Sequence, residues 1–445
     1  MAAHRLSCAA TRTREEPAVM PSASISPLRA ALGPGLLMAG AAVGVSHLVQ
    51  STRAGAEYGL LLLPLVLLAC LLKYPFLEFG PRYAVATGDN LLIGYRRIGR
   101  WALGLFAVIT IGTLFIIQAV VTVVTAGLAG LVFGLEASPA TLSAGILAAC
   151  VLLLAIGNYR GLDLVMKMVM AVLAVSTVAA LTLALSDQPD WSGLAGFDQG
   201  PRLWSGAGFA FLLALLGWMP IPLDVAVWHS LWTQERARET GRTPAMSHAL
   251  IDFRVGYIGA TLLAAAFLLL GALLMYASGM GFEDSAVGFS AQLVELYAGS
   301  LGEWSRPLIA VAALSVMFST TLAVTDAYPR VLSALLAVAR FGAEDARARR
   351  PHHPWSYRVF LLAVIAGALL ILHLAGARFT QLIDFATTVS FLSAPVLAWI
   401  TFRVITDAHV PEYARPGAGM RALSWAGMVF LTLFSITWVG WRLLG

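Results

Sequence analysis

The stretch FAFLLALLGWMPIPLDVAVWHSLW, residues 209–232, is apolar and long enough to cross a membrane, but it cannot form one continuous helix. Proline has no backbone N–H and its ring clashes with the preceding turn, so Pro220 and Pro222 interrupt the helix near its middle. In lipid, backbone without hydrogen-bond partners is tolerated only where it is buried in protein or lines a polar cavity. The stretch therefore predicts two half-helices that meet at such a place.

A second stretch, GPGLLMAGAAVGVSHLVQSTRAGAEYG at residues 33–59, carries a similar interruption. It is apolar as far as Val43 and then reads GVSH, residues 44–47, before the apolar pattern resumes. In the order of the hydrophobic runs these two stretches are the first and the sixth, so they correspond in two five-helix halves of opposite orientation. Such a pair of interrupted spans indicates the midplane site of an inverted-repeat transporter. Kinks that serve packing alone are the alternative.

The composition indicates an integral membrane protein. Of the 445 residues, 59% are hydrophobic and only 12% are charged, and the mean hydropathy is +0.80. A soluble domain cannot bury that much apolar surface. Runs of about 20 mostly apolar residues, the length of a spanning helix, occur near 33–57, 60–86, 101–133, 140–157, 162–186, 203–232, 251–278, 306–338, 357–375, 380–404 and 422–443.

These runs predict an all-α membrane fold with a 5+5 inverted repeat and one additional helix. Helices 1–5 are expected at about 33–186, helices 6–10 at about 203–404 and helix 11 at about 422–443, with helices 1 and 6 broken at the midplane. Residues 1–30 contain no apolar run, and we expect them to form a disordered cytoplasmic tail. A single transmembrane transporter domain then fills residues 31–445.

Basic residues are concentrated in alternate loops. One set of loops holds Arg96, Arg97, Arg100, Arg160, Lys167, Arg236, Arg238, Arg242, Arg340, Arg347, Arg349, Arg350, Arg358, Arg403, Arg415 and Arg421, whereas the other set is mostly acidic. This bias predicts a multi-pass protein of the inner or plasma membrane with a cytoplasmic amino terminus and an outside carboxyl terminus. It also explains the net charge of +5 without a nucleic-acid partner.

Motifs of enzymes and of cysteine-based sites are missing from the sequence. It contains no nucleophile elbow, HExxH, P-loop or paired catalytic carboxylate motif, so we expect no enzyme activity. The three cysteines are isolated, which argues against a disulfide framework or a cysteine metal site. We expect a monomer in the lipid bilayer without a cofactor.

Nearly all of the hydrophobic chain resembles the NRAMP family of proton-coupled divalent-metal transporters, which have eleven helices and the LeuT-type fold. Residues 33–59 align without a gap with the family's first helix, and RYAVATGDNL, residues 82–91, resembles the end of its second. FSTTLAVTD, residues 318–326, resembles its eighth helix, and His229-Ser230 its sixth. The resemblance implies a secondary active transporter that works by alternating access.

The sequence departs from the family at the residues that hold the metal. The family's first-helix signature is Asp-Pro-Gly-Asn, and these positions read Gly44, Val45, Ser46 and His47 here. Its sixth-helix signature is Met-Pro-His-Asn, but the position of that methionine falls on Pro222 when counted back from His229. A dication normally needs at least one carboxylate, and the break in helix 1 offers none. We therefore expect no metal site.

The same break favours an anion as substrate. Two half-helices are expected to begin near Ser46 and Leu223, and the amino-terminal end of a helix presents free N–H groups and partial positive charge. We predict sodium-coupled uptake of a small inorganic anion, with bicarbonate as the leading candidate. The predicted substrate-binding residues are Gly44, Val45, Ser46, His47, Pro220, Ile221, Pro222 and Leu223.

Coupling and gating residues follow from the resemblance to LeuT-type transporters, in which sodium lies between helix 1 carbonyls and helix 8 hydroxyls. The candidate sodium ligands are Ala42, Val43, Ser319, Thr320 and Thr321. The alternative is that the hydroxyls bond back to their own helix. Asp224, His229 and Gln50 are predicted to be gating or proton-linked residues.

Three alternatives remain open from the sequence. Asp224 would repel an anion if it faced the pocket, and it would instead be an N-terminal cap if it only started the second half-helix. A divalent transition metal is the alternative substrate, held by His47, Asp224, Met219 and carbonyls. A receptor or sensor that moves no solute is the third alternative, although the sequence offers no soluble signalling domain.

Overall fold

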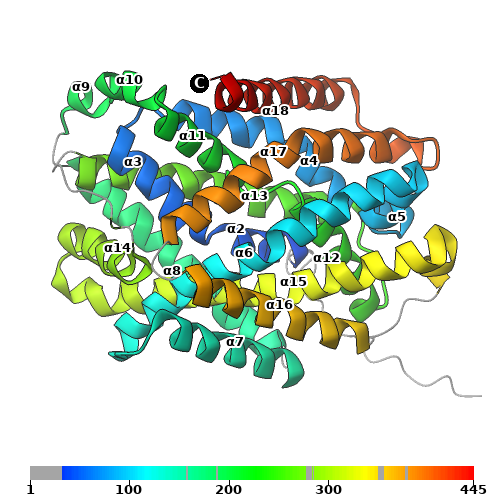
Figure 1. Ribbon diagram of the computed structural model, residues 1–445, viewed down its shortest axis with the longest axis horizontal. Coiled ribbons are helices and arrows are strands. Elements are labelled where there is room, and N and C mark those ends of the chain that lie inside the picture. The colour runs from blue at the N-terminus through cyan, green and yellow to red at the C-terminus, as the bar shows by residue number, and fades with distance from the viewer. Residues whose placement is uncertain are drawn as a thin grey trace, which may run out of the picture.

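The computed structural model describes residues 33–156, 159–186, 189–276, 283, 285–348, 355–375 and 379–444, and every regular element within them is a helix (Figure 1). In chain order these are α2 Pro34–Ala42, η1 Ser46–Ser51, α3 Thr52–Tyr58, α4 Leu63–Thr87, α5 Leu91–Ile98, α6 Arg100–Phe133, α7 Pro139–Ile156, α8 Tyr159–Ser186, α9 Trp191–Leu194, η2 Phe197–Gln199, α10 Gly200–Leu203, α11 Gly206–Trp218, α12 Val225–Thr240, α13 Met246–Leu270, η3 Gly271–Tyr276, α14 Ala286–Leu301, η4 Glu303–Ser305, α15 Arg306–Ala348, α16 Trp355–Ala375, α17 Phe379–Thr406, η5 Glu412–Ala414 and α18 Ala418–Leu444. The predicted tail at 1–30 lies outside the described residues.

The long helices follow the order of the hydrophobic runs. Within the described residues, seven helices are long and apolar enough to cross a membrane. The first and sixth runs do not qualify because each is divided into shorter helices, α2–η1–α3 and α11–α12. The fourth and fifth runs are α7 and α8, whose apolar segments are 17 residues or shorter in the described part of the chain. The two predicted breaks are thus present.

Equivalent helices of the two halves make equivalent contacts. The first part of helix 1, α2, packs against α13, which is the seventh long helix, and the second part of helix 6, α12, packs against α4, which is the second. An inverted repeat exchanges helix 1 with helix 6 and helix 7 with helix 2, so in each half the broken helix packs against the second helix of the other half, although through its first part in helix 1 and its second part in helix 6. The longest helix, α15, packs against α6 beside them. The broken helices therefore lie at the centre of the bundle.

Small residues allow helix 1 to approach α13 and η3 closely. A Cβ atom at Gly55 would collide with the backbone oxygen of Leu268, and one at Gly271 would collide with the backbone oxygen of Thr52. Small residues at membrane helix interfaces allow this kind of close backbone packing.

The amino-terminal end of helix 1 is held by a carboxylate of the same partner helix. The backbone N–H of Gly33 donates to Asp252 Oδ1 at 3.0 Å, and that of Gly35 donates to Oδ2 at 2.6 Å. A carboxylate at this position pairs orphan N–H groups and complements the helix dipole. Helix 1 is therefore fixed to α13 before its break is reached.

Candidate substrate and ion site

Helix 1 is interrupted at Val43 and Gly44. Val43 has φ −77° and ψ 63°, and the N–H of Gly44 donates to the carbonyl of Ala42 at 2.8 Å. These values describe an inverse γ-turn, which ends α2. The chain then resumes as the π-helical segment η1, a wider helix type that is frequent at functional sites. The break is therefore a single tight turn followed by a widened helical turn.

Ser46 and His47 bond to the protein directly after the break. The Ser46 hydroxyl donates to the Ala42 carbonyl at 2.6 Å and lies 2.8 Å from His47 Nδ1. His47 Nε2 lies 2.8 Å from the carbonyl oxygen of Ala260 on α13, and because a carbonyl only accepts, Nε2 is the donor. Both ring nitrogens of the buried His47 are thus engaged. The expectation that its imidazole donates to the substrate does not agree with these contacts.

Gly44, at the position of the family's aspartate, faces helix 8. A Cβ atom at Gly44 would lie 2.7 Å from Thr320 Cγ2 and 2.8 Å from its Oγ1, so α15 fills the space beside the glycine. The Thr320 hydroxyl donates to the carbonyl of Gly40 at 2.7 Å. Thr320 is therefore placed against the carbonyl end of α2, and its role as a sodium ligand stays a prediction.

Another predicted sodium ligand, Thr321, faces away from helix 1. Thr321 directs its hydroxyl to α6, where it contacts Thr125 Oγ1 at 2.7 Å and the carbonyl of Val121 at 3.1 Å. It does not join Thr320 at helix 1, because neighbouring residues of a helix point about 100° apart. Ser319 is buried on the same helix, with 3% of its surface exposed.

Helix 6 is interrupted between Trp218, the last residue of α11, and Val225, the first of α12. Pro220 has no N–H to give to the Leu216 carbonyl four residues before it. The ammonium of Lys73, on α4, takes this place: Nζ donates to the Gly217 carbonyl at 2.9 Å and to the Leu216 carbonyl at 3.3 Å. The carbonyl end of α11 is therefore paired with a buried cation from another helix.

The gating candidates are buried around the two breaks. Asp224 is buried and directly precedes α12, but it makes no side-chain capping bond there. His229 packs on Phe253 with ring centroids 5.7 Å apart, and its Nδ1 has no partner within the described residues. Gln50 Nε2 donates to Asp384 on α17 at 3.4 Å.

A small cavity of about 40 Å³ lies between the two breaks. This is room for roughly three water molecules or a small ion. Its lining consists of Ala41, Val45, Ser46, Ile117, Trp218, Ile221, Pro222, Val225, Trp228 and Tyr328. Val45, Ser46, Ile221 and Pro222 are among the predicted substrate-binding residues, whereas Gly44, His47, Pro220 and Leu223 are not part of the lining. Neither is Asp224.

Two polar residues of this cavity, Trp228 and Tyr328, were not predicted from the sequence. Trp228 and Tyr328 line the cavity, and their donors, Trp228 Nε1 and the Tyr328 hydroxyl, are buried and have no hydrogen-bond partner within the described residues. Buried polar groups are normally paired, so two unpaired donors beside a cavity indicate a ligand or water that accepts hydrogen bonds. Aromatic residues in an apolar span suggest packing, and only their position near the breaks could have marked them in the sequence.

The chain matches known proteins over most of its length. The sequence profile described as natural resistance-associated macrophage protein-like, Nramp, matches residues 35–440. The chain belongs to the Nramp family. It is 34% identical to an uncharacterized protein of Pasteurella multocida over 93% of each chain. It is 25% identical to the divalent metal cation transporter MntH of Xanthomonas campestris, over 89% of this chain and 87% of the relative.

Solved structures show the same fold. A manganese transporter of Eremococcus coleocola, solved as a variant with one histidine replaced by alanine, superposes with a TM-score of 0.66 over 92% of this chain and 86% of that one, at 16% identity. The expected all-α LeuT-type fold is therefore confirmed, as is the resemblance to the family. This Nramp chain is a multi-pass membrane transporter and not an enzyme.

Polar contacts join the elements of this Nramp protein at both ends of the bundle. Figure 1 shows α3 near one end and α5 near the other. Beside α3, Arg53 pairs with Glu57 at 2.7 Å and with Asp384 of α17 at 3.2 Å. Beside α5, Arg97 pairs with Asp89 at 3.1 Å and Glu344 at 3.3 Å.

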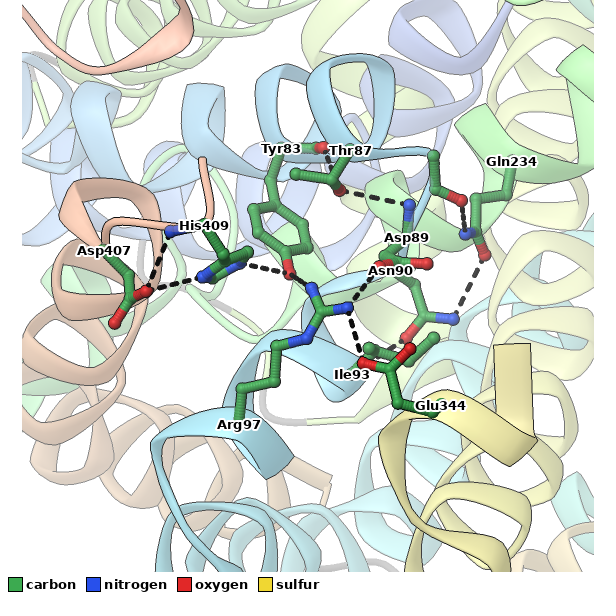
Figure 2. Close-up of polar contacts among 11 residues, drawn as sticks. Tyr83, Thr87, Asp89, Asn90, Ile93, Arg97, Gln234, Glu344, Asp407 and His409 are labelled. Carbon is green, nitrogen blue, oxygen red and sulfur yellow. Dashed lines mark hydrogen bonds and ion pairs between the residues drawn. The ribbon is translucent and has the colours of Figure 1, made fainter. Parts of the chain in front are cut away.

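The network around Arg97 reaches further along the same end of the molecule (Figure 2). Arg97 donates to the Tyr83 hydroxyl at 3.3 Å, and this hydroxyl lies 3.0 Å from His409 Nε2. In the same view, Asn90 donates to Gln234 of α12 at 3.1 Å. Helix 2, α5, the second half of helix 6 and the segment before α18 are thereby linked.

Proposed function

We propose that this Nramp-family transporter carries a small anion, with bicarbonate as the leading candidate and sodium as the coupling ion. The observation that carries the proposal is the pair of unpaired donors, Trp228 Nε1 and the Tyr328 hydroxyl, at a cavity whose lining includes no carboxylate within the described residues. An indole N–H can only donate, and a cation cannot use it. These two groups therefore favour a ligand that accepts hydrogen bonds.

The backbone N–H groups at the start of the second half of helix 6 were expected to bind the anion, but they already have partners. At the start of α12, the N–H groups of Val225, Ala226 and Val227 already donate to Pro222, Leu223 and Asp224, at 3.3, 3.1 and 2.9 Å. Free amides of this half-helix therefore contribute less than expected, and the side chains of Trp228 and Tyr328 take the larger part, because the Ser46 hydroxyl already donates to the Ala42 carbonyl. The size of the cavity also favours a small ion.

Sodium coupling is supported by the arrangement of Thr320. Its hydroxyl hydrogen is given to the Gly40 carbonyl, which leaves the lone pairs of Oγ1 available to a cation. The carbonyl of Val43 is near the same break and is a hard oxygen ligand that suits sodium, whereas the carbonyl of Ala42 already accepts from the Gly44 N–H and the Ser46 hydroxyl. A sodium ion at this place would offset the charge of a neighbouring anion and make the pair easier to bury.

A divalent transition metal is the second candidate, because relatives of this chain are named divalent metal cation transporters. In its favour, the buried sulfur of Met219 lies at the break of helix 6, where Ser51 donates to it at 3.4 Å. The described residues contain no group of three or more His, Cys, Asp and Glu side chains that could hold a metal. Both nitrogens of His47 are also engaged by protein atoms.

Transport in liposomes separates the candidates. Purified protein is reconstituted, and uptake of labelled bicarbonate under an inward sodium gradient is compared with an equal potassium gradient and with empty vesicles. Manganese influx is followed in the same preparation. We expect sodium-dependent bicarbonate uptake without manganese entry. Manganese entry without bicarbonate uptake would overturn the proposal, and the movement of neither ion would favour a sensor.

The variant Tyr328→Phe tests the site itself. It removes one donor from the cavity and leaves the ring, so we expect the KM for the anion to rise about tenfold or more, as for a lost hydrogen bond to a charged group. Tyr297→Phe is the control, because its buried hydroxyl bonds to Thr177 away from the cavity. An unchanged KM in Tyr328→Phe would contradict the assignment of this cavity.

A further inference from the structure

Lys73 is a buried lysine in the middle of a spanning helix. It lies on α4 with 1% of its surface exposed. A charged side chain within a membrane span is costly and is generally retained where it has a partner and a function. The partners of Lys73 are two backbone carbonyls, those of Leu216 and Gly217, and not a carboxylate at bonding distance within the described residues.

These carbonyls are at a place where a helix attracts cations. The last four carbonyls of α11 have no partner within the helix, and the helix dipole gives this end partial negative charge. Pro220 removes the N–H that would otherwise pair with Leu216. Carbonyl oxygens of interrupted helices are the groups with which transporters of this architecture coordinate cations. The Lys73 ammonium occupies such a position with a charge that is part of the chain.

We propose that Lys73 determines the ion specificity of this transporter, because its ammonium occupies the carbonyl oxygens at the break of helix 6 and denies them to a transported cation. The inference rests on the proposed anion transport and supplies a physical reason for it. The sequence shows that the family's aspartate is missing from helix 1. The structure adds that the Leu216 and Gly217 carbonyls, at the break of helix 6, are paired with the Lys73 ammonium.

Asp224 gives Lys73 a second role. The buried carboxylate follows the break directly before α12, the helix that packs against α4, which carries Lys73. With both groups charged, the break of helix 6 carries no net charge, and an anion in the neighbouring cavity is not repelled by an uncompensated carboxylate. Without Lys73, the break would present Asp224, the Met219 sulfur and two free carbonyls, which together are a set of cation ligands.

Substitution of Lys73 tests this inference by cation binding as well as transport. In Lys73→Met we expect manganese, titrated calorimetrically into the purified full-length protein, to bind at least tenfold more tightly than to the unsubstituted protein. Bicarbonate uptake in liposomes should fall at least tenfold. In Lys73→Met/Asp224→Asn the tight manganese binding should disappear and part of the bicarbonate uptake should return, because the break is again without net charge.

Two further variants serve as an alternative substitution, in case Lys73→Met does not fold, and as a control. Lys73→Leu also removes both the charge and the donor that occupies the two carbonyls, so it should show the manganese binding expected of Lys73→Met if that variant does not fold. Cys70→Ala, one turn earlier on the same helix and also buried, should behave like the unsubstituted protein. Thermal unfolding in detergent confirms that each variant is folded.

The outcomes distinguish this inference from the proposed function. Folded Lys73→Met or Lys73→Leu protein that binds manganese no more tightly than the unsubstituted protein would overturn the role of Lys73. A double variant that binds manganese as tightly as Lys73→Met would overturn the balance with Asp224. The proposed function is tested separately on the unsubstituted protein, where manganese entry without bicarbonate uptake would contradict it.

Discussion

Gly44 has no room for a side chain, and this gives a prediction at the scale of one residue. In Gly44→Ala the new Cβ would lie 2.7 Å from Thr320 Cγ2, so helix 1 or α15 must shift. Overpacking of this kind costs about 1–3 kcal/mol. We expect a lower midpoint of thermal unfolding in detergent, together with reduced sodium-dependent uptake because Thr320 moves with the contact.

Gly104 provides the matched control for this substitution. It lies within α6, and a Cβ atom there would meet nothing within 4 Å among the described residues. Gly104→Ala should therefore leave the unfolding midpoint unchanged or raise it slightly, since alanine favours a helix more than glycine does. If Gly44→Ala unfolded at the same temperature as Gly104→Ala, the close contact between helix 1 and Thr320 would be refuted.

The sequence predicted where helices 1 and 6 break, but it did not predict which residues contact one another across the bundle. Pro220, Pro222 and Gly44 change the backbone locally, so their effect could be read from the sequence. The contacts of Lys73 and Tyr328 are made across the bundle with residues far away in the chain, and no local pattern specifies them. His47 illustrates the limit: its place at the break was predicted, but its engagement with Ala260 of α13 was not.

At the scale of elements, the short helix α5 is fixed by Arg97. This side chain pairs with Asp89, whose side chain is 1% exposed, and also with Glu344 at the far end of α15. Removal of one partner of a buried charge costs about 1–3 kcal/mol or more. We expect Arg97→Met to lower the unfolding midpoint and to increase proteolysis of the segment between α4 and α6.

Arg96 is the comparison for this prediction, because it precedes Arg97 on α5 and has no ion pair within the described residues. Arg96→Met should leave both measurements near those of the unsubstituted protein. Equal losses in the two variants would show that α5 needs only positive charge near its end, which favours a helix C-terminus in general, and that the network in Figure 2 does not fix it.

Hydropathy predicted the long helices of this fold more completely than the short ones. A run of about 20 apolar residues has few alternatives to a spanning helix in lipid. The helices α5 and α14 were not predicted, because each lies in a connection between long runs and is too short to span. The start of α5 has a local signal, since the Asn90 side chain accepts from the Ile93 N–H at 3.3 Å as an N-terminal cap.

At the scale of the whole molecule, the sequence predicts an odd number of crossings and therefore termini on opposite sides of the membrane. The basic loops predict a cytoplasmic amino terminus. The cysteines allow a direct measurement, because Cys70 and Cys150 are buried and Cys8 precedes the first span. A membrane-impermeant thiol reagent should therefore leave the unsubstituted protein unlabelled in intact cells and label it at Cys8 after permeabilisation. A cysteine appended after Gly445 should be labelled in intact cells, whereas its protection until permeabilisation would place both termini inside and require an even number of crossings.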